Sequence, residues 1–369
     1  MKRRNIRIRL AALLTAALTA WSAGSLAAGE WLAVGSEAPE DPNFLVQDEY
    51  SGTIRITFLG DCTLGGEEKT RTAAYGFFRM TEKNGTDWPF RNLKALTGGD
   101  DLTVANLEGV LSDRDLPKVK KEYNFIGPTA YTEILTEGSV ECVTLANNHS
   151  HDYDNAGYRD TQEALDAAGV AWFGTDRAIA WRSGEGLMIG FLGVSGSLSG
   201  NRGKDYEQKA KILREMGCAA VITVMHAGTE YEAEPDGYQR QIVKKATQCG
   251  TDLIIGHHPH IVQGYEIADG VPVVYSLGNC VFGGNGNPRD HDALAVQAEL
   301  RFTEGELTEI TLHLWPITVT GMKNRNDYSP VLLTGRDAER VLRKMAESTG
   351  NDPGSFDEKE GAVITVSVK

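Results

Sequence analysis

Residues 219–260 read AAVITVMHAGTEYEAEPDGYQRQIVKKATQCGTDLIIGHHPH and contain one complete strand–helix–strand unit. The two apolar runs, at 219–225 and 253–255, are typical of fully buried strands. Between them, residues 238–249 have a helical pattern that ends at Gly250, a common helix stop. Two buried strands joined by a helix indicate an α/β protein.

The same alternation extends along the chain, with further apolar runs at 54–59, 102–105, 142–146, 187–194 and 271–277. Helical patterns are predicted at 158–168, 206–216 and 336–347. The C-terminal part breaks this rhythm, because residues 293–302 and 307–314 alternate polar and apolar around Glu304-Gly305 and predict an antiparallel hairpin. Residues 362–368 predict a last edge strand. This mixture favours a layered sandwich with helices outside over a (β/α)8 barrel.

The composition is that of an ordinary globular protein, with 369 residues of which 41% are hydrophobic and 24% charged. Acidic residues outnumber basic ones by 51 to 37, and the net charge of −14 argues against a nucleic-acid partner. Five scattered cysteines without a CxxC pair predict neither a disulfide framework nor a zinc knuckle. We interpret Cys142 and Cys218 as small buried apolar residues, and whether any pair is bridged stays open.

The N-terminus has the pattern of a secretory signal peptide over residues 1–27. Five Lys and Arg residues precede an apolar run at 10–21, and Ser25-Leu26-Ala27 is a small-residue cleavage site. Cleavage leaves 32 basic and 51 acidic residues, a net charge of −19, whereas an uncleaved signal would act as a membrane anchor. We therefore expect an exported protein, extracellular or in the cell envelope, with a linker at 28–52 and one domain at 53–369.

Polar residues follow the predicted strands where each strand ends, which is where α/β proteins bind ligands. These clusters are Gly60-Asp61, Asn106-Leu107-Glu108, Asn147-Asn148-His149, His226 and His257-His258-Pro259-His260. Each cluster alone is typical of a turn or a helix cap. Together they form a donor set of Asp, Glu, Asn and His without thiolates, which suits one or two divalent ions of Mn, Fe or Zn. Two such metal ions side by side activate a bound water and neutralise charge on a substrate oxygen. A nearby His can protonate the leaving group.

Six motifs together resemble the CapA family of poly-γ-glutamate capsule proteins: Gly60-Asp61, Asn106-Leu107-Glu108, Leu145-Ala146-Asn147-Asn148-His149, His226-Ala227-Gly228-Thr229-Glu230-Tyr231, Gly256-His257-His258-Pro259-His260 and Tyr275-Ser276-Leu277-Gly278-Asn279. That family is similar in fold to the calcineurin-like metallophosphoesterases. The resemblance spans about residues 53–345 and implies a four-layer αββα sandwich with mixed sheets that carries a binuclear metal site.

The resemblance implies metal-ligand roles for Asp61, Glu108, Asn148, His226, His258 and His260, and an acid role for His149. It pairs Asp61 and His260 on one metal and Asn148 and His226 on the other. Asn106, Glu230 and Asn279 are expected to orient ligands, although Glu230 could instead cap the segment before Pro235.

Two departures from the phosphoesterase pattern put full metal occupancy in question. Those enzymes have Asp-x-His in the first motif, whereas Cys62-Thr63 follows Asp61 here, so one histidine ligand is missing. The bridging aspartate of those enzymes is also replaced here, by Asn106 or Glu108.

Three functions are compatible with the sequence. The first is an exported metal-dependent hydrolase that acts on a phosphoester, or on an amide or ester of a cell-surface polymer. The second is a non-catalytic component of poly-γ-glutamate synthesis or export that binds polymer carboxylates through its metal, beside membrane capsule-synthase proteins. The third, a solute-binding protein, rests on export and acidity alone.

Overall fold

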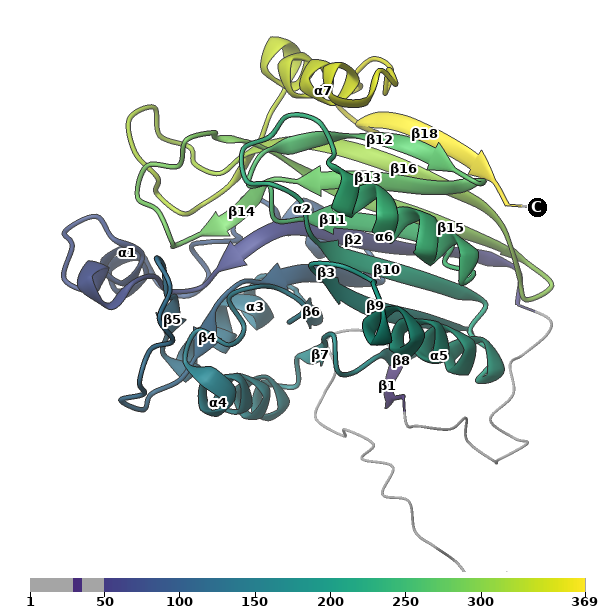
Figure 1. The fold of residues 1–369 in the computed structure, drawn as a ribbon. Helices are drawn as coiled ribbons and strands as arrows, with labels where there is room; N and C mark the ends of the chain where they lie inside the picture. Colours follow the sequence, from purple (N-terminus) through teal and green to yellow (C-terminus); the bar gives the residue numbers. More distant parts are fainter. Residues whose placement is uncertain (1–28, 35–49, 369) are drawn as a thin grey trace, which may run out of the picture.

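The computed structural model describes residues 29–34 and 50–368, which form two mixed β-sheets with helices around them (Figure 1). The first sheet has the strand order β1-β8-β9-β10-β11-β13-β12. The bounds of its strands are β1 Gly29–Ala33, β8 Ile179–Ser183, β9 Met188–Ser195, β10 Ala220–His226, β11 Leu253–His257, β12 Val262–Ala268 and β13 Val271–Leu277. The central strands β9, β10, β11 and β13 are parallel, and antiparallel strands complete both edges.

The second sheet has the strand order β17-β16-β15-β2-β3-β6-β7, with β14 paired to β2 and β18 to β16. The bounds of its strands are β2 Gly52–Thr63, β3 Leu102–Leu107, β6 Cys142–Thr144, β7 Ala171–Phe173, β14 Asn279–Phe282, β15 Asp292–Thr303, β16 Glu306–Thr318, β17 Val331–Leu332 and β18 Ala362–Ser367. Strands β2, β3, β6 and β7 are parallel, whereas β15 and β16 form a long antiparallel hairpin. A small separate ladder joins β4 (Val110–Leu111) to β5 (Ile126–Gly127).

Three buried apolar clusters define four layers. The largest lies between the sheets and includes Phe58 of β2 and Phe191 of β9. The second joins the other face of β2 and β3 to α1 (Phe77–Asn84), α2 (Lys94–Thr97), α3 (Thr132–Glu137) and α4 (Asp154–Ala168). The third joins the outer face of the first sheet to α5 (Asn201–Glu215) and α6 (Gly237–Gln248). Two 3-10 turns, η2 (Glu68–Thr70) and η3 (Thr129–Tyr131), complete the connections, and α7 (Gly335–Thr349) packs beside β12 and β16.

The predicted αββα sandwich with mixed sheets and a C-terminal hairpin is confirmed by this arrangement. Every predicted apolar run forms or overlaps a strand, and the four predicted helices overlap α4, α5, α6 and α7. The hairpin turn falls at Glu304 and Gly305, which have φ values of 51° and 79°. The edge strand predicted at 362–368 is β18.

Part of the predicted linker is wrong. Residues 29–33 form β1, which pairs antiparallel with β8, and Trp31 packs on Phe191 with ring centroids 6.0 Å apart. A five-residue strand with one buried residue, two half-buried and two exposed has too short an alternation to be recognised from its sequence. Strand β6 is also shorter than predicted, because it ends at Thr144.

The five cysteines are all free thiols, so no pair of them is bridged. Cys142 and Cys218 are buried in apolar clusters, as predicted. The predicted signal peptide at 1–27 lies outside the described residues. In the part of the chain that the structure describes, no helix combines the length and apolarity needed to cross a bilayer.

Candidate metal centre

The carboxyl ends of parallel strands bring the predicted site residues to one end of the sandwich. In the first sheet, His226 at the end of β10 is in register with Ser195 of β9 and His257 of β11. In the second sheet, Asp61 of β2 is in register with Asn106 of β3. The two sheets therefore contribute residues to the same cluster.

A β-bulge at Gly60 aims Asp61 into this cluster. The register of β2 with β3 shifts between Leu59 and Asp61, so Gly60 is an extra residue. A Cβ at position 60 would lie 2.2 Å from the carbonyl oxygen of Gly278, and only glycine allows this approach. The bulge lets the Asp61 amide donate to that same oxygen at 3.0 Å.

Asp61 is fully buried and held in its ionised form. Burial opposes ionisation, but the hydrogen bond and charge of His260 hold the pKa of Asp61 well below its usual range. The Nδ1 atom of His260 lies 3.3 Å from Asp61 Oδ2, and the Asn106 amide donates to Asp61 Oδ1 at 2.7 Å. Asp61 and His260 are thus neighbours, as the resemblance implies.

Glu108, directly after β3, is the most unusual side chain of the cluster. It is fully buried, and neither carboxylate oxygen has a hydrogen-bond partner among the described residues. Its Oε1 atom lies 3.6 Å from His226 Nε2, 3.8 Å from His260 Nε2 and 3.9 Å from His149 Nε2, distances too long for hydrogen bonds. Burial, reinforced by the charge of Asp61, raises the pKa of Glu108 to about 8. A bound cation would satisfy such a carboxylate, so the residues present fit a divalent ion.

His226 and His258 form the other side of the cluster. His226 Nε2 lies 2.8 Å from Asn148 Oδ1 and 3.1 Å from His258 Nδ1. Burial lowers the pKa of His226 well below its ordinary value and also lowers the pKa of His258. Both rings are therefore neutral near pH 7, the form that binds metal.

The backbone around His258 and His260 is strained. Their φ values are 100° and 57°, in a region that residues with a Cβ adopt rarely. Tyr231, with φ of 62°, donates its amide to Pro259 O at 2.8 Å and joins the two loops. Strain of this kind collects at functional sites, where the surrounding structure imposes it.

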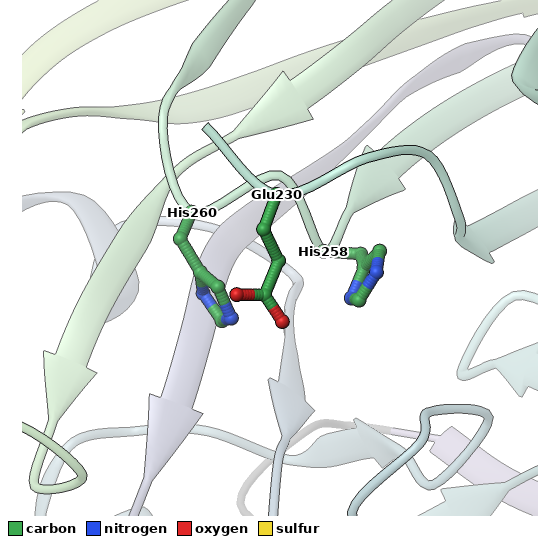
Figure 2. Close-up of side chains that lie close together, drawn as sticks. All are labelled: Glu230, His258 and His260. Carbon is green, nitrogen blue, oxygen red and sulfur yellow. The ribbon is translucent and has the colours of Figure 1, made fainter. Parts of the chain in front are cut away.

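Figure 2 shows the carboxylate of Glu230 between the rings of His258 and His260. A ligand atom of each of these three residues lies within 4.8 Å of the other two. The helix that follows this loop, α6, is capped by Asp236, which accepts from the amides of Tyr238 and Gln239. Glu230 is exposed at the mouth of the cluster and can reach an ion bound by either histidine.

His149 lies in the loop before α4, at the edge of the cluster. Its Nδ1 atom is 2.8 Å from Oδ2 of the buried Asp152, which also accepts from the Phe125 amide at 2.6 Å. Lys121 pairs with Asp152, and its Nζ atom lies 3.0 Å from His149 Nδ1. Burial lowers the pKa of His149, and Asp152 opposes this effect. With Nδ1 engaged, Nε2 is the nitrogen that faces the cluster.

Two asparagines hold the candidate ligands in place. Asn106 donates to Asp61, lies 3.2 Å from His226 Nδ1 and accepts from Asn147 at 3.0 Å. Asn279, the first residue of β14, has its Oδ1 atom 2.9 Å from His260 Nδ1 and donates to His260 O at 3.2 Å. Their positions agree with a role in orienting ligands.

The sequence did not indicate Asp152 or Lys121, and it indicated Asn147 only as a member of the strand-end cluster, without a role. Asp152 follows His149 by three residues, a spacing that could have suggested the pair, whereas nothing in the sequence links Lys121 to the cluster. Thr63 stands at the position of the missing histidine and is buried. Its neighbour Cys62 belongs to the apolar cluster beneath α1–α4, and its thiol donates to Gly60 O at 3.4 Å.

The fold and the cluster define a two-sheet α/β protein with a candidate metal centre at the carboxyl ends of its strands. More particularly, the chain belongs to the family described as bacterial capsule synthesis protein PGA_cap, which matches residues 55–284 and so includes every candidate site residue. The resemblance to the CapA family is thereby confirmed.

Two curated relatives are similar over most of the chain. The PGA biosynthesis protein CapA of Bacillus subtilis (strain 168) is 28% identical over 283 residues, 70% of this chain and 72% of that protein. The capsule biosynthesis protein CapA of Bacillus anthracis is 26% identical over 322 residues, 80% of this chain and 74% of that protein. Among solved structures, TT1561 of Thermus thermophilus matches 66% of this chain and 94% of its own at 12% identity, with a TM-score of 0.39.

Proposed function

We propose that this protein takes part in poly-γ-glutamate capsule biosynthesis as an exported metal-dependent hydrolase. Membership of the capsule synthesis family and the two CapA relatives support the biological role. The observation that carries the chemistry is Glu108, a buried carboxylate without a hydrogen-bond partner in the described chain and surrounded by histidine nitrogens.

The donor set supports one or two ions of Mn, Fe or Zn. Asp61, Glu108 and His260 would hold one ion, and Asn148, His226 and His258 a second, with Glu230 within reach of His258 and His260. A divalent ion bound there supplies two effects: it lowers the pKa of a water ligand and neutralises charge on the substrate oxygen.

His149 is the residue we assign to proton transfer. Asp152 holds its Nδ1 atom, and its Nε2 atom faces Glu108 at the edge of the cluster. A histidine in this position can give a proton to the amine or alcohol that leaves when the bond breaks. Asp152 acts as a positioning residue for His149.

The substrate that best fits the family is the γ-amide bond of poly-γ-glutamate, and a phosphoester is the alternative bond. Membrane capsule-synthase proteins are the expected partners. The missing first-motif histidine favours a second candidate, a non-catalytic component that binds polymer carboxylates through its metal, since one ion position has lost a donor.

A hydrolysis assay tests the proposal. We expect the metal-loaded protein to shorten a γ-linked glutamate oligomer, and His149→Gln to lower kcat about 10²-fold or more while metal content is unchanged. His313→Gln, on β16 and outside the cluster, is the matched control. A parallel assay with a phosphate monoester distinguishes the two bonds. Hydrolysis that survives complete removal of metal would refute the proposal.

A further inference from the structure

The metal centre opens into a cavity of about 320 Å³, and a second cavity of about 450 Å³ continues from it. Asn148, His226 and His258 line the first cavity on its metal side. Ser195, Ser197 and Arg202 line both cavities. Arg202 therefore lies between the candidate ligands and the second cavity.

The fold holds Arg202 in this place. Strand β9 ends at Ser195, in register with His226 of β10, and the amide of Gly196 donates to His226 O at 3.1 Å. The chain then turns into α5, and Arg202 is the second residue of that helix. A Cβ at Gly196 would lie 3.6 Å from Arg202 Nη1, so the guanidinium lies over the strand-end loop beside the metal centre.

Within the described part of the chain, no acidic group neutralises the charge of Arg202. Across residues 29–34 and 50–368, no hydrogen bond or ion pair engages its guanidinium. By contrast, the other cation of the second cavity, Lys209, is paired with Asp205 at 2.6 Å and donates to Thr175 O at 2.7 Å. An unpaired guanidinium at a concave surface of a protein with net charge −14 is suited to bind an anion, and its planar fork matches a carboxylate.

We propose that Arg202, with the hydroxyls of Ser195 and Ser197, binds a carboxylate of the substrate next to the bond held at the metal centre. This inference rests on the proposed function. Every unit of γ-linked glutamate carries one free α-carboxylate, so a chain with one amide at the metal presents a carboxylate to the neighbouring cavity. The second cavity, which Asp176 and Asp205 line together with Arg202 and Lys209, then receives the next units. Arg202 offsets part of the local repulsion between an acidic protein and an anionic polymer.

The test compares Arg202→Gln with Lys204→Gln, an exposed lysine on the same helix that lines neither cavity. Calorimetry measures the Kd of a γ-linked glutamate oligomer, and of the same oligomer with its α-carboxylates amidated, for the metal-loaded protein. We expect Arg202→Gln to raise the oligomer Kd about tenfold or more and Lys204→Gln to leave it unchanged. Metal content should be equal in all three proteins. We expect the Kd of the amidated oligomer for wild type to be as high as the Kd of the unmodified oligomer for Arg202→Gln.

The outcomes separate this inference from the proposed function. Three results would overturn the carboxylate subsite. Wild type and Arg202→Gln bind the oligomer with the same Kd, wild type binds the amidated and the unmodified oligomer with the same Kd, or wild type does not bind the oligomer. Hydrolysis with an unchanged KM in Arg202→Gln would overturn it while the hydrolase proposal stands. Arg202-dependent binding without any hydrolysis would support the subsite and refute the hydrolase.

Discussion

Without a bound ion, the buried carboxyl group of Glu108 lowers the free energy of unfolding of the protein. Both carboxylate oxygens are buried and unpartnered within the described chain, and an unsatisfied buried polar group costs on the order of 1–3 kcal/mol. The sequence indicated this residue only through its place after a strand. It could not indicate the lack of a hydrogen-bond partner, because that depends on His226 at the end of β10 and on His149 and His260 in two loops.

Glu108→Gln should therefore separate metal binding from folding. At pH 9, above the pKa of about 8 of Glu108, we expect the free energy of unfolding of the metal-free variant to exceed that of metal-free wild type by on the order of 1–3 kcal/mol, because the amide cannot ionise. The difference should be smaller at pH 6, where Glu108 is protonated. Added Mn or Zn should raise the Tm of wild type and leave the variant nearly unchanged. Equal metal-dependent gains in both proteins, measured by thermal denaturation, would show that Glu108 is not a ligand.

The strands and their turns position the cluster, and the bulge in β2 is the element with the strictest requirement. Gly60 approaches Gly278 so closely that no side chain fits between them. The sequence predicted β2 correctly because a buried apolar run is easily recognised, and Asp61 lies near the end of that strand. It did not predict the bulge, which depends on how β2 pairs with β3 and β14.

Gly60→Ala should disturb both stability and metal binding. We expect a loss of about 2 kcal/mol or more of the free energy of unfolding, because the backbone of β2 or β14 must shift to admit the methyl group. Metal content should fall as Asp61 is displaced. Gly237→Ala, at the start of α6 with no atom within 4 Å of the added Cβ, is the control and should be neutral or slightly stabilising. Urea denaturation of both variants checks this, and a Gly60→Ala protein as stable as wild type would contradict it.

Two carboxyls near the opposite end of β3, the half-buried Asp100 and the buried Glu141, make stability depend on pH. Burial raises the pKa of Asp100 to about 6 and of Glu141 to about 7, and Glu141 accepts from the Thr103 amide at 2.7 Å. The folded protein therefore binds these protons more tightly than the unfolded chain, whose carboxyls titrate near pH 4. The stability contributed by their protonated forms is present below about pH 4 and is lost as pH rises towards 7.

Glu141→Gln should reduce this pH dependence. We expect the variant to be more stable than wild type at pH 8, by about 1–3 kcal/mol, and to differ much less at pH 4.5, because the amide cannot ionise. Urea denaturation at the two pH values measures the difference. Glu137→Gln, an exposed residue of α3, is the control. A constant difference between variant and wild type at both pH values would rule out ionisation of Glu141 as the cause.

At the scale of the whole molecule, the sequence was sufficient for the layers and for most residues of the cluster. Buried strands and their terminal polar residues are local patterns, so Asp61, His226 and His260 could be assigned to one end of the sandwich. Strand β1, the Asp152–His149 pair and Arg202 depend on contacts between distant segments, which no local pattern reports. The net negative charge could be read from the sequence, whereas the position of Arg202 beside the metal centre could not.

The most direct test of the account is the metal content of the purified protein, measured by elemental analysis beside a His226→Ala, His258→Ala double variant. We expect one or two equivalents of Mn, Fe or Zn per wild-type chain and a loss of metal in the variant. One equivalent would agree with the missing first-motif histidine. Wild-type metal no higher than that of the double variant would contradict the central claim and leave a protein that has the fold without the metal chemistry.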